Sequence, residues 1–261
     1  MSSANAVVVT GSSGGLGFAT AQRFLKDGYT VFGFDFGTPA RLKGSGNAEF
    51  VPFRVDVSNN ESVREAVTAA AKHAPIAGLI HCAGIAEFGP DNPGHLVAPT
   101  SGQVIDNLDT IERTLRVNLG GTFIVLRHVI AAMTARDTPA NEERGFIILT
   151  SSGAAFEGKP GQSAYSASKA GVIGMTLPLA RELSPWAIRI ATIAPGLFDT
   201  PILAETPRLP RHIPFPNRMG HPNEYAALAH HIAQNSYINA EVIRLDGGIR
   251  SAFESASPFV R

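Results

Sequence analysis

Short apolar runs alternate with longer helical patterns along most of this chain, and this alternation limits the fold more than any other feature. We expect strands at 6–10, 30–34, 49–55, 77–82, 145–150, 188–194 and 241–245, and helices at 15–28, 59–73, 109–135, 163–184 and 222–235. The strand segments are apolar along nearly their whole length, which is typical of parallel strands covered on both faces. The sequence therefore predicts an α/β fold with a doubly wound parallel sheet of about seven strands.

The chain is expected to form one domain, residues 1–261. Its 261 residues are enough for one large α/β core, and no internal repeat or low-complexity linker divides them. The irregular segment 196–221 carries five prolines and lies between a predicted strand and a predicted helix. Connections of this length are usually functional or disordered, and we expect this one to form a substrate loop or lid.

Charge, cysteine content and hydropathy limit which binding partners and which cellular location are expected. Lysine and arginine together number 22, as do aspartate and glutamate, so the formal net charge is zero. A chain without excess charge is not expected to bind nucleic acid or an acidic membrane surface. The single cysteine, Cys82, excludes an internal disulfide and favours a reducing, cytoplasmic location. No uninterrupted apolar stretch of about 18 residues predicts a membrane span, and too few residues precede the first strand for a signal peptide.

A glycine-rich turn, TGSSGGLG at residues 10–17, joins the first predicted strand to the first predicted helix. Backbone N–H groups at a helix N-terminus bind phosphate, and glycine lets the backbone approach it closely. The glycines at 11, 15 and 17, with Gly14 in addition, do not match the G-x-G-x-x-G spacing. By itself the turn is equally well explained as an ordinary strand–helix connection.

Asp35 ends the second predicted strand about 20 residues after this turn, where a carboxylate binds both ribose hydroxyls of NAD. The same carboxylate would repel a 2′-phosphate, and no Arg or Lys lies within 10–22. We therefore predict NAD rather than NADP, although a solvated loop aspartate is the simpler alternative. Asp56 and Val57 follow the third strand and are expected to hold the adenine edge. Asp56 would equally suit a helix cap.

Tyr165 and Lys169 are four residues apart on a predicted helix and share one face. An unperturbed tyrosine titrates near about 10, and a neighbouring ammonium would lower that pKa. Such a tyrosine can take a proton from an alcohol or return it to a ketone. Ser152, 13 residues before Tyr165, is placed to hydrogen-bond the reacting oxygen, with Ser151 as the rival.

These motifs together resemble the short-chain dehydrogenase/reductase family. The resemblance rests on T-G-x-x-x-G-x-G, on C-A-G after the fourth strand, on Asn118 and Ser152, and on Tyr165-x-x-x-Lys169, and it runs from about residue 6 to 250. It implies a single-domain Rossmann-type fold and an NAD-dependent oxidoreductase without a metal. His81 departs from the pattern, because the family usually has an asparagine there that braces the central sheet.

The resemblance also implies residue roles. Ser152, Tyr165, Lys169 and Asn118 would be catalytic, Asn118 by anchoring a water relay to the lysine. Lys169 would hold the nicotinamide ribose, and the Leu197 backbone and the Thr200 hydroxyl would meet the carboxamide. The implied cofactor contacts are Gly11, Ser13, Gly15, Leu16, Gly17, Asp35, Asp56, Val57, Cys82, Ala83, Gly84, Tyr165, Lys169, Pro195, Gly196, Leu197 and Thr200.

The stretches at 154–171, 193–203, 214–226 and 241–250 further resemble the type-2 3-hydroxyacyl-CoA dehydrogenases, a branch tied to fatty acid metabolism that also oxidises hydroxysteroids. In that branch the residue at Gln162 faces the substrate, although it would also suit a helix N-terminus. The substrate carbon would lie against Leu203, Leu209 or Phe215. No Lys or Arg lies between Gly84 and Arg113, so the phosphates of CoA would depend on cations of the lid, Arg208, Arg211, His212 and Arg218.

Three functions remain open from the sequence. The first is an NAD-dependent 3-hydroxyacyl-CoA dehydrogenase, and the second is a dehydrogenase of free secondary alcohols or hydroxysteroids. The third is a non-enzymatic interaction protein on the same fold, which the complete set of Ser, Tyr, Lys and Asn disfavours. The family resemblance also predicts a homotetramer, in which helices 109–135 and 163–184 pair across a two-fold axis.

Overall fold

The computed structural model describes residues 6–38, 42–44, 46–86, 94–98, 101–136, 142–201 and 213–250. The sheet has seven parallel strands in the order β3-β2-β1-β4-β5-β6-β7, which confirms the predicted doubly wound α/β fold. The strands are β1 Ala6–Thr10, β2 Thr30–Asp35, β3 Phe50–Arg54, β4 Ile76–His81, β5 Gly145–Thr150, β6 Ile188–Pro195 and β7 Val242–Leu245.

The helices lie where the sequence predicts them, with one interruption. They are α1 Gly15–Lys26, α2 Asn60–His73, α3 Leu108–Leu115, α4 Gly121–Thr134, α5 Ser163–Leu183 and α6 Pro222–Gln234. The single helix predicted at 109–135 is divided by a π-helical turn, η1, at Arg116–Gly120, which contains Asn118. Such a turn inserts an extra residue without ending the helical run, so periodicity alone does not reveal it. Short 3₁₀ turns lie at Gly153–Ala155 (η2) and Ser184–Trp186 (η3).

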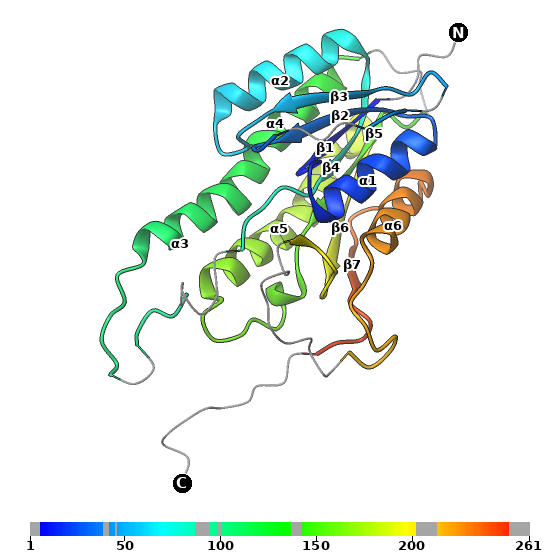
Figure 1. Cartoon of the computed structure of the whole chain (residues 1–261). Coiled ribbons are helices and arrows are strands. Elements are labelled where there is room, and N and C mark those ends of the chain that lie inside the picture. Colours follow the sequence, from blue (N-terminus) through cyan, green and yellow to red (C-terminus); the bar gives the residue numbers. More distant parts are fainter. Residues whose placement is uncertain are drawn as a thin grey trace.

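Helices cover both faces of the sheet (Figure 1). On one face α1 packs against α6, and Phe24 and Tyr225 are fully buried in a core shared with β1, β4 and β5. On the other face α2, α4 and α5 bury a second core that includes Val129 and Val172. This two-sided burial is the physical reason that the strands are apolar along their length.

The strand order reverses between β1 and β4, since β2 and β3 extend the sheet on one side and β4 to β7 on the other. In parallel sheets of this kind, ligands bind outside the carboxyl ends of the strands at that point. The glycine turn, Asp35, Asp56, Cys82, Ser152 and Gly196 all follow or end strands at this edge. Residues distant in sequence are therefore brought together by the topology.

The helical run Leu108–Thr134 is long and apolar enough to cross a membrane by length and composition, with a mean hydropathy of 1.3 over its most apolar window. That window is 39% buried inside the fold, and core helices of water-soluble proteins pass the same test. Composition therefore leaves the run's role open, and its contacts with α2 and α5 place it in the core beside the sheet.

Candidate active site

Two adjoining cavities open at the carboxyl edge of the sheet. The larger, about 910 Å³, lies over the glycine turn and the ends of β2 and β3. The smaller, about 220 Å³, lies over the ends of β5 and β6 and the start of α5. Both are lined by Leu16, Cys82, Gly84, Ile85 and Thr200. The shared walls make the two cavities parts of one site.

The glycine turn has the geometry expected of a phosphate-binding turn. Gly11 has φ +67°, in the left-handed region that favours glycine, and a Cβ on Gly17 would lie 2.2 Å from the Gly11 carbonyl oxygen. Gly14 is the N-cap of α1 and supplies no side-chain cap, so the first N–H groups of α1 are left for another partner. Ser13, Gly15, Leu16 and Gly17 line the larger cavity. This helix start can hold a diphosphate.

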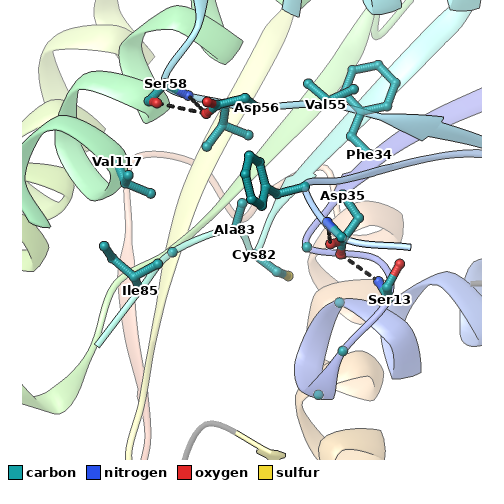
Figure 2. Close-up of a pocket in the computed structure, with 18 of the residues that line it drawn as sticks. Ser13, Phe34, Asp35, Val55, Asp56, Ser58, Cys82, Ala83, Ile85 and Val117 are labelled. Carbon is teal, nitrogen blue, oxygen red and sulfur yellow. Dashed lines mark hydrogen bonds between the residues drawn. The ribbon is translucent and has the colours of Figure 1, made fainter. Parts of the chain in front are cut away.

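Asp35 is fixed in place at the end of β2 (Figure 2). Its Oδ2 accepts a hydrogen bond from the Ser13 N–H at 2.8 Å, and its Oδ1 accepts one from the Gly37 N–H at 3.0 Å. The half-buried carboxylate lines the larger cavity, as a ribose-binding group should. Arg54, on the adjacent β3, donates to the Phe36 carbonyl at 3.3 Å and is a cation that counting along the chain misses. Arg54 is absent from the cavity lining.

Asp56 lies next to Ser58, apart from Asp35, in the view of Figure 2, and it lines the same cavity as Ile85 and Val117. Its Oδ1 accepts from the Ser58 N–H at 2.9 Å and from the Ser58 hydroxyl at 2.7 Å. Asn59, rather than Asp56, caps α2, because the Asn59 side chain accepts from Ser62 N–H. Asp56 and Val57 both line the larger cavity, and their contact with the adenine edge stays a prediction.

The same wall contains residues that the sequence did not single out, namely Ile85, Arg113, Arg116 and Val117. Arg113 and Arg116 are three residues apart, a spacing that places side chains on one face of a helix. That spacing was visible in the sequence. What was not visible is that α3 and η1 run past the end of β3.

Gly84 lies where the two cavities meet the catalytic candidates. A Cβ on Gly84 would lie 3.1 Å from Asn118 Oδ1 and 3.2 Å from Lys169 Nζ. The Asn118 side chain, buried in η1, accepts from the Ile85 N–H at 2.8 Å and donates to the Ile85 carbonyl at 2.9 Å and to Ser168 Oγ at 3.1 Å. Asn118 therefore clamps the chain that follows β4 against the helical run.

Ser152, Tyr165 and Lys169 line the smaller cavity together, as the sequence predicts. The Ser152 side chain is hydrogen-bonded to the Tyr165 side chain, and its Oγ also accepts from the Ala154 N–H at 3.1 Å. The Ser151 hydroxyl instead donates to the Lys169 carbonyl at 2.8 Å. Of the two candidate serines, Ser152 is the one that reaches the tyrosine.

The electrostatics of Tyr165 differ from the expectation. Burial raises the pKa of Tyr165, and the hydrogen bond to Ser152 opposes this. Lys169 does not reverse the balance, because its Nζ lies 5.9 Å from the centre of the Tyr165 ring and donates to the Thr150 carbonyl at 3.1 Å. Burial also lowers the pKa of Lys169 to about 8. The predicted lowering of the Tyr165 pKa by the ammonium was therefore wrong for the chain by itself.

The remaining predicted contacts fall into three groups: residues of the smaller cavity, the exposed Phe215, and residues outside the described part of the chain. Pro195, Gly196, Leu197 and Thr200 line the cavity, and so does Gln162, whose Oε1 accepts from the Lys159 N–H at 3.1 Å. Phe215 is 82% exposed and lines neither described cavity. Leu203, Leu209, Arg208, Arg211 and His212 lie outside the described residues.

Two further predicted features concern charge. The Arg218 guanidinium is paired with the Glu224 carboxylate at 2.8 Å, so it is not available to a phosphate without breaking that pair. Within the described part of the chain, no group of three or more His, Cys, Asp or Glu side chains is placed to hold a metal ion.

Known proteins resemble this chain over nearly its whole length. A family model described as short chain dehydrogenase matches residues 5–209. The 3-hydroxyacyl-CoA dehydrogenase type-2 of Homo sapiens is 44% identical over 253 residues, covering 93% of this chain and 94% of that protein. The protein of the same description from Drosophila melanogaster is 42% identical over 257 residues, covering 94% and 98%.

Solved structures of related proteins have the same fold over nearly the whole chain. The crystal structure of 3-hydroxyacyl-CoA dehydrogenase type-2 from Mycobacterium avium has a TM-score of 0.82 and 38% identity, covering 96% of this chain and 97% of that one. The 3-ketoacyl-(acyl-carrier-protein) reductase from Brucella melitensis, complexed with NADH, has a TM-score of 0.79 and 27% identity, covering 94% and 97%.

Proposed function

This chain belongs to the short-chain dehydrogenase family and is an oxidoreductase, and from that premise we propose that it oxidises a 3-hydroxyacyl-CoA to the 3-oxoacyl-CoA with NAD and catalyses the reverse reduction. The observation that carries the proposal is the meeting of Ser152, Tyr165 and Lys169 in one cavity that shares walls with the glycine-turn cavity. This arrangement places proton-transfer groups beside a site suited to a dinucleotide.

Ser152, Tyr165 and Lys169 each have a role in this chemistry. When bound, NAD would accept the hydride from the alcohol carbon. Ser152 hydrogen-bonds the substrate oxygen, and Tyr165 Oη takes the hydroxyl proton as the carbonyl forms. Lys169 supplies positive charge near Tyr165, and the Asn118 side chain holds the Ile85 backbone in the cavity wall. Because burial raises the pKa of Tyr165, oxidation should accelerate with rising pH, whereas the protonated phenol suits ketone reduction near neutral pH.

The preference for NAD over NADP rests on Asp35. Its carboxylate is held toward the cavity by two backbone N–H groups, so it is positioned for a ribose diol and repels a 2′-phosphate. Arg54, the cation on the neighbouring strand, lies outside the cavity lining, whereas Arg113 and Arg116 line the same cavity from α3 and η1.

The acyl-CoA assignment is supported by the likeness of this chain to 3-hydroxyacyl-CoA dehydrogenases type-2, at 42–44% identity. The cavity is also compatible with a free secondary alcohol. The ratio of kcat/KM for a 3-hydroxyacyl-CoA and for its N-acetylcysteamine thioester separates the two, because only the former carries phosphates. A ratio near one would favour the free-alcohol alternative.

Tyr165→Phe tests the reaction itself. The change keeps the ring and removes the proton acceptor, so turnover should fall by about 10²–10⁴-fold while NADH binding, followed by fluorescence, is retained. Tyr237→Phe is the matched control, since Tyr237 is 97% exposed and lies outside both cavities. Near-normal turnover of Tyr165→Phe would remove the proposed mechanism, and no turnover in the wild type would favour the non-enzymatic alternative.

We also propose that the chain assembles as a homotetramer through α4 and α5. Phe123 on α4 and Leu177 on α5 are large apolar side chains that are 53% and 46% exposed, and a partner subunit packed on these helices would cover them. A monomeric mass in light scattering at micromolar concentration would contradict this assembly.

A further inference from the structure

Three buried side chains form a directed chain of hydrogen bonds beneath the two cavities. His81 ends β4, Thr10 ends β1, and Thr122 lies in α4. His81 Nδ1 is 2.9 Å from Thr10 Oγ1, and His81 Nε2 is 3.0 Å from Thr122 Oγ1. The exposed fractions of the three residues are 2% or less, so water does not compete for these contacts.

The direction of each hydrogen bond follows from counting hydrogens. The Thr122 hydroxyl donates its one hydrogen to the Asn118 carbonyl at 2.6 Å, so it must accept from His81, which requires hydrogen on Nε2. Burial and the charge of Lys169 lower the pKa of His81 to about 3, so the ring is neutral and Nδ1 accepts from the Thr10 hydroxyl. Thr10 Oγ1 in turn accepts from the Ala83 N–H at 3.0 Å.

The chain of bonds therefore begins at the Ala83 backbone, beside the cofactor cavity, and ends at the Asn118 backbone. Asn118 returns to the same segment, because its side chain holds both the N–H and the carbonyl of Ile85. Gly84 lies between these two held points, and a Cβ added there would lie 3.1 Å from Asn118 Oδ1 and 3.2 Å from Lys169 Nζ. The segment Cys82–Ile85 is thus held at both ends.

We propose that His81 is a positioning residue for the reaction: it holds the Cys82–Ile85 segment and Asn118 in place, and so fixes the wall that the two cavities share. This inference rests on the proposed function. His81 then does more than join β1 to β4. The hydrogen bonds on its Thr122 side lead to Asn118, whereas those on its Thr10 side lead to Ala83, which lines the larger cavity.

Breaking the hydrogen bonds on the Thr122 side of His81 and breaking those on the Thr10 side should affect different kinetic constants. Thr122→Val removes the hydroxyl at nearly constant volume and leaves the His81–Thr10–Ala83 half intact. It should lower kcat about tenfold, since small displacements of catalytic groups are costly, while the dissociation constant for NADH stays within about twofold. Thr10→Val should instead weaken NADH binding, because it frees the Ala83 backbone.

Thr176→Val is the matched control. The Thr176 and Thr192 hydroxyls lie 2.7 Å apart, between α5 and β6, and both residues are as buried as Thr122. Neither residue lines either of the two cavities. The control should lower the melting temperature as much as Thr122→Val does, with kcat unchanged. If the two valine variants have the same kcat, His81 is only a structural brace and the proposal is overturned.

His81→Leu and His81→Gln complete the test. The effects of His81→Leu and Thr122→Val on kcat should be strongly non-additive, since both break one chain of bonds, whereas independent multiplication of the two effects would contradict the coupling. His81→Gln keeps one donor and one acceptor and should lie closer to the wild type than His81→Leu. If His81→Leu does not fold, the comparison of Thr122→Val with Thr176→Val still decides.

A direct measurement needs no turnover. Nitrogen-15 NMR of the histidine rings should show His81 as the neutral tautomer with hydrogen on Nε2 from pH 5 to 9, and hydrogen on Nδ1 would overturn the assigned direction. Tyr165→Phe, measured alongside these variants, distinguishes a failure of the proposed function from a failure of the role of His81. If it retains turnover, the proposed function fails; if it loses turnover while Thr122→Val matches its control, only the role of His81 fails.

Discussion

Lys169 is expected to destabilise the fold that it serves, and replacing it with methionine should show this. The side chain is 5% exposed, and burial lowers its pKa from 10.5 to about 8. At about 1.4 kcal/mol for each pKa unit, holding the charged form in the fold costs about 3 kcal/mol at neutral pH. Lys169→Met also loses the hydrogen bond to the Thr150 carbonyl, which contributes about 1 kcal/mol. The variant should therefore be more stable than the wild type by about 2 kcal/mol at pH 7.

The pH dependence of this stability difference shows whether the buried charge of Lys169 causes it. Below about pH 8 the lysine is charged in both the folded and the unfolded chain, so the full cost is present. Between about pH 8 and 10.5 the folded chain releases its proton first, and the stability of the wild type rises relative to the variant. The two proteins should have nearly equal stability by about pH 10.

Urea denaturation at pH 7 and pH 10, at one protein concentration, measures both differences. Lys72→Met, the same change at an exposed position of α2, should alter stability by less than about 0.5 kcal/mol at both pH values. A Lys169→Met variant that is less stable at pH 7, or whose difference from wild type does not change with pH, would refute the reasoning. The variant should also lose turnover, as expected where function is kept at a cost in stability.

Three further substitutions test the cofactor and substrate sites. Asp35→Ala should lower kcat/KM for NAD and narrow its advantage over NADP, and equal values for the two cofactors in the wild type would remove the argument from the carboxylate. Gly17→Ala places a Cβ 2.2 Å from the Gly11 carbonyl oxygen and should weaken NADH binding at least about tenfold. Gly174→Ala, with no atom within 4 Å of the new Cβ, should not change NADH binding, and equal affinities in the two variants would contradict the role of the turn. Lys159 and Lys169 are the cations among the described residues that line the smaller cavity, so Lys159→Gln should raise KM for a 3-hydroxyacyl-CoA but not for its N-acetylcysteamine thioester. A parallel change in both KM values would show that Lys159 does not meet a phosphate.

Most of the fold followed from the sequence because its signals are local. Each strand is a short apolar run and each helix a longer pattern, and the seven strands and their parallel arrangement are as predicted. Most of the predicted cofactor and catalytic residues line the two adjoining cavities, because parallel strands place their carboxyl ends at one edge. A residue within two positions of the end of a strand, such as Gly11 or Ser152, must then lie near that edge.

Other properties depended on contacts between residues far apart in the chain. The choice of Ser152 over Ser151 was decided by the direction of the Ser151 hydroxyl, which donates to the Lys169 carbonyl 18 residues later. The raised pKa of Tyr165 follows from burial, which no spacing between Tyr165 and Lys169 reports.

The sequence by itself determined the class of fold and which residue types reach the active-site edge, because strand and helix periodicity are properties of neighbouring residues. Only the tertiary structure decided how His81 replaces the expected asparagine, since its two partners, Thr10 and Thr122, are 71 and 41 residues away. A hydrogen bond depends on distance and direction in space, and the packing of β1, β4 and α4 sets both.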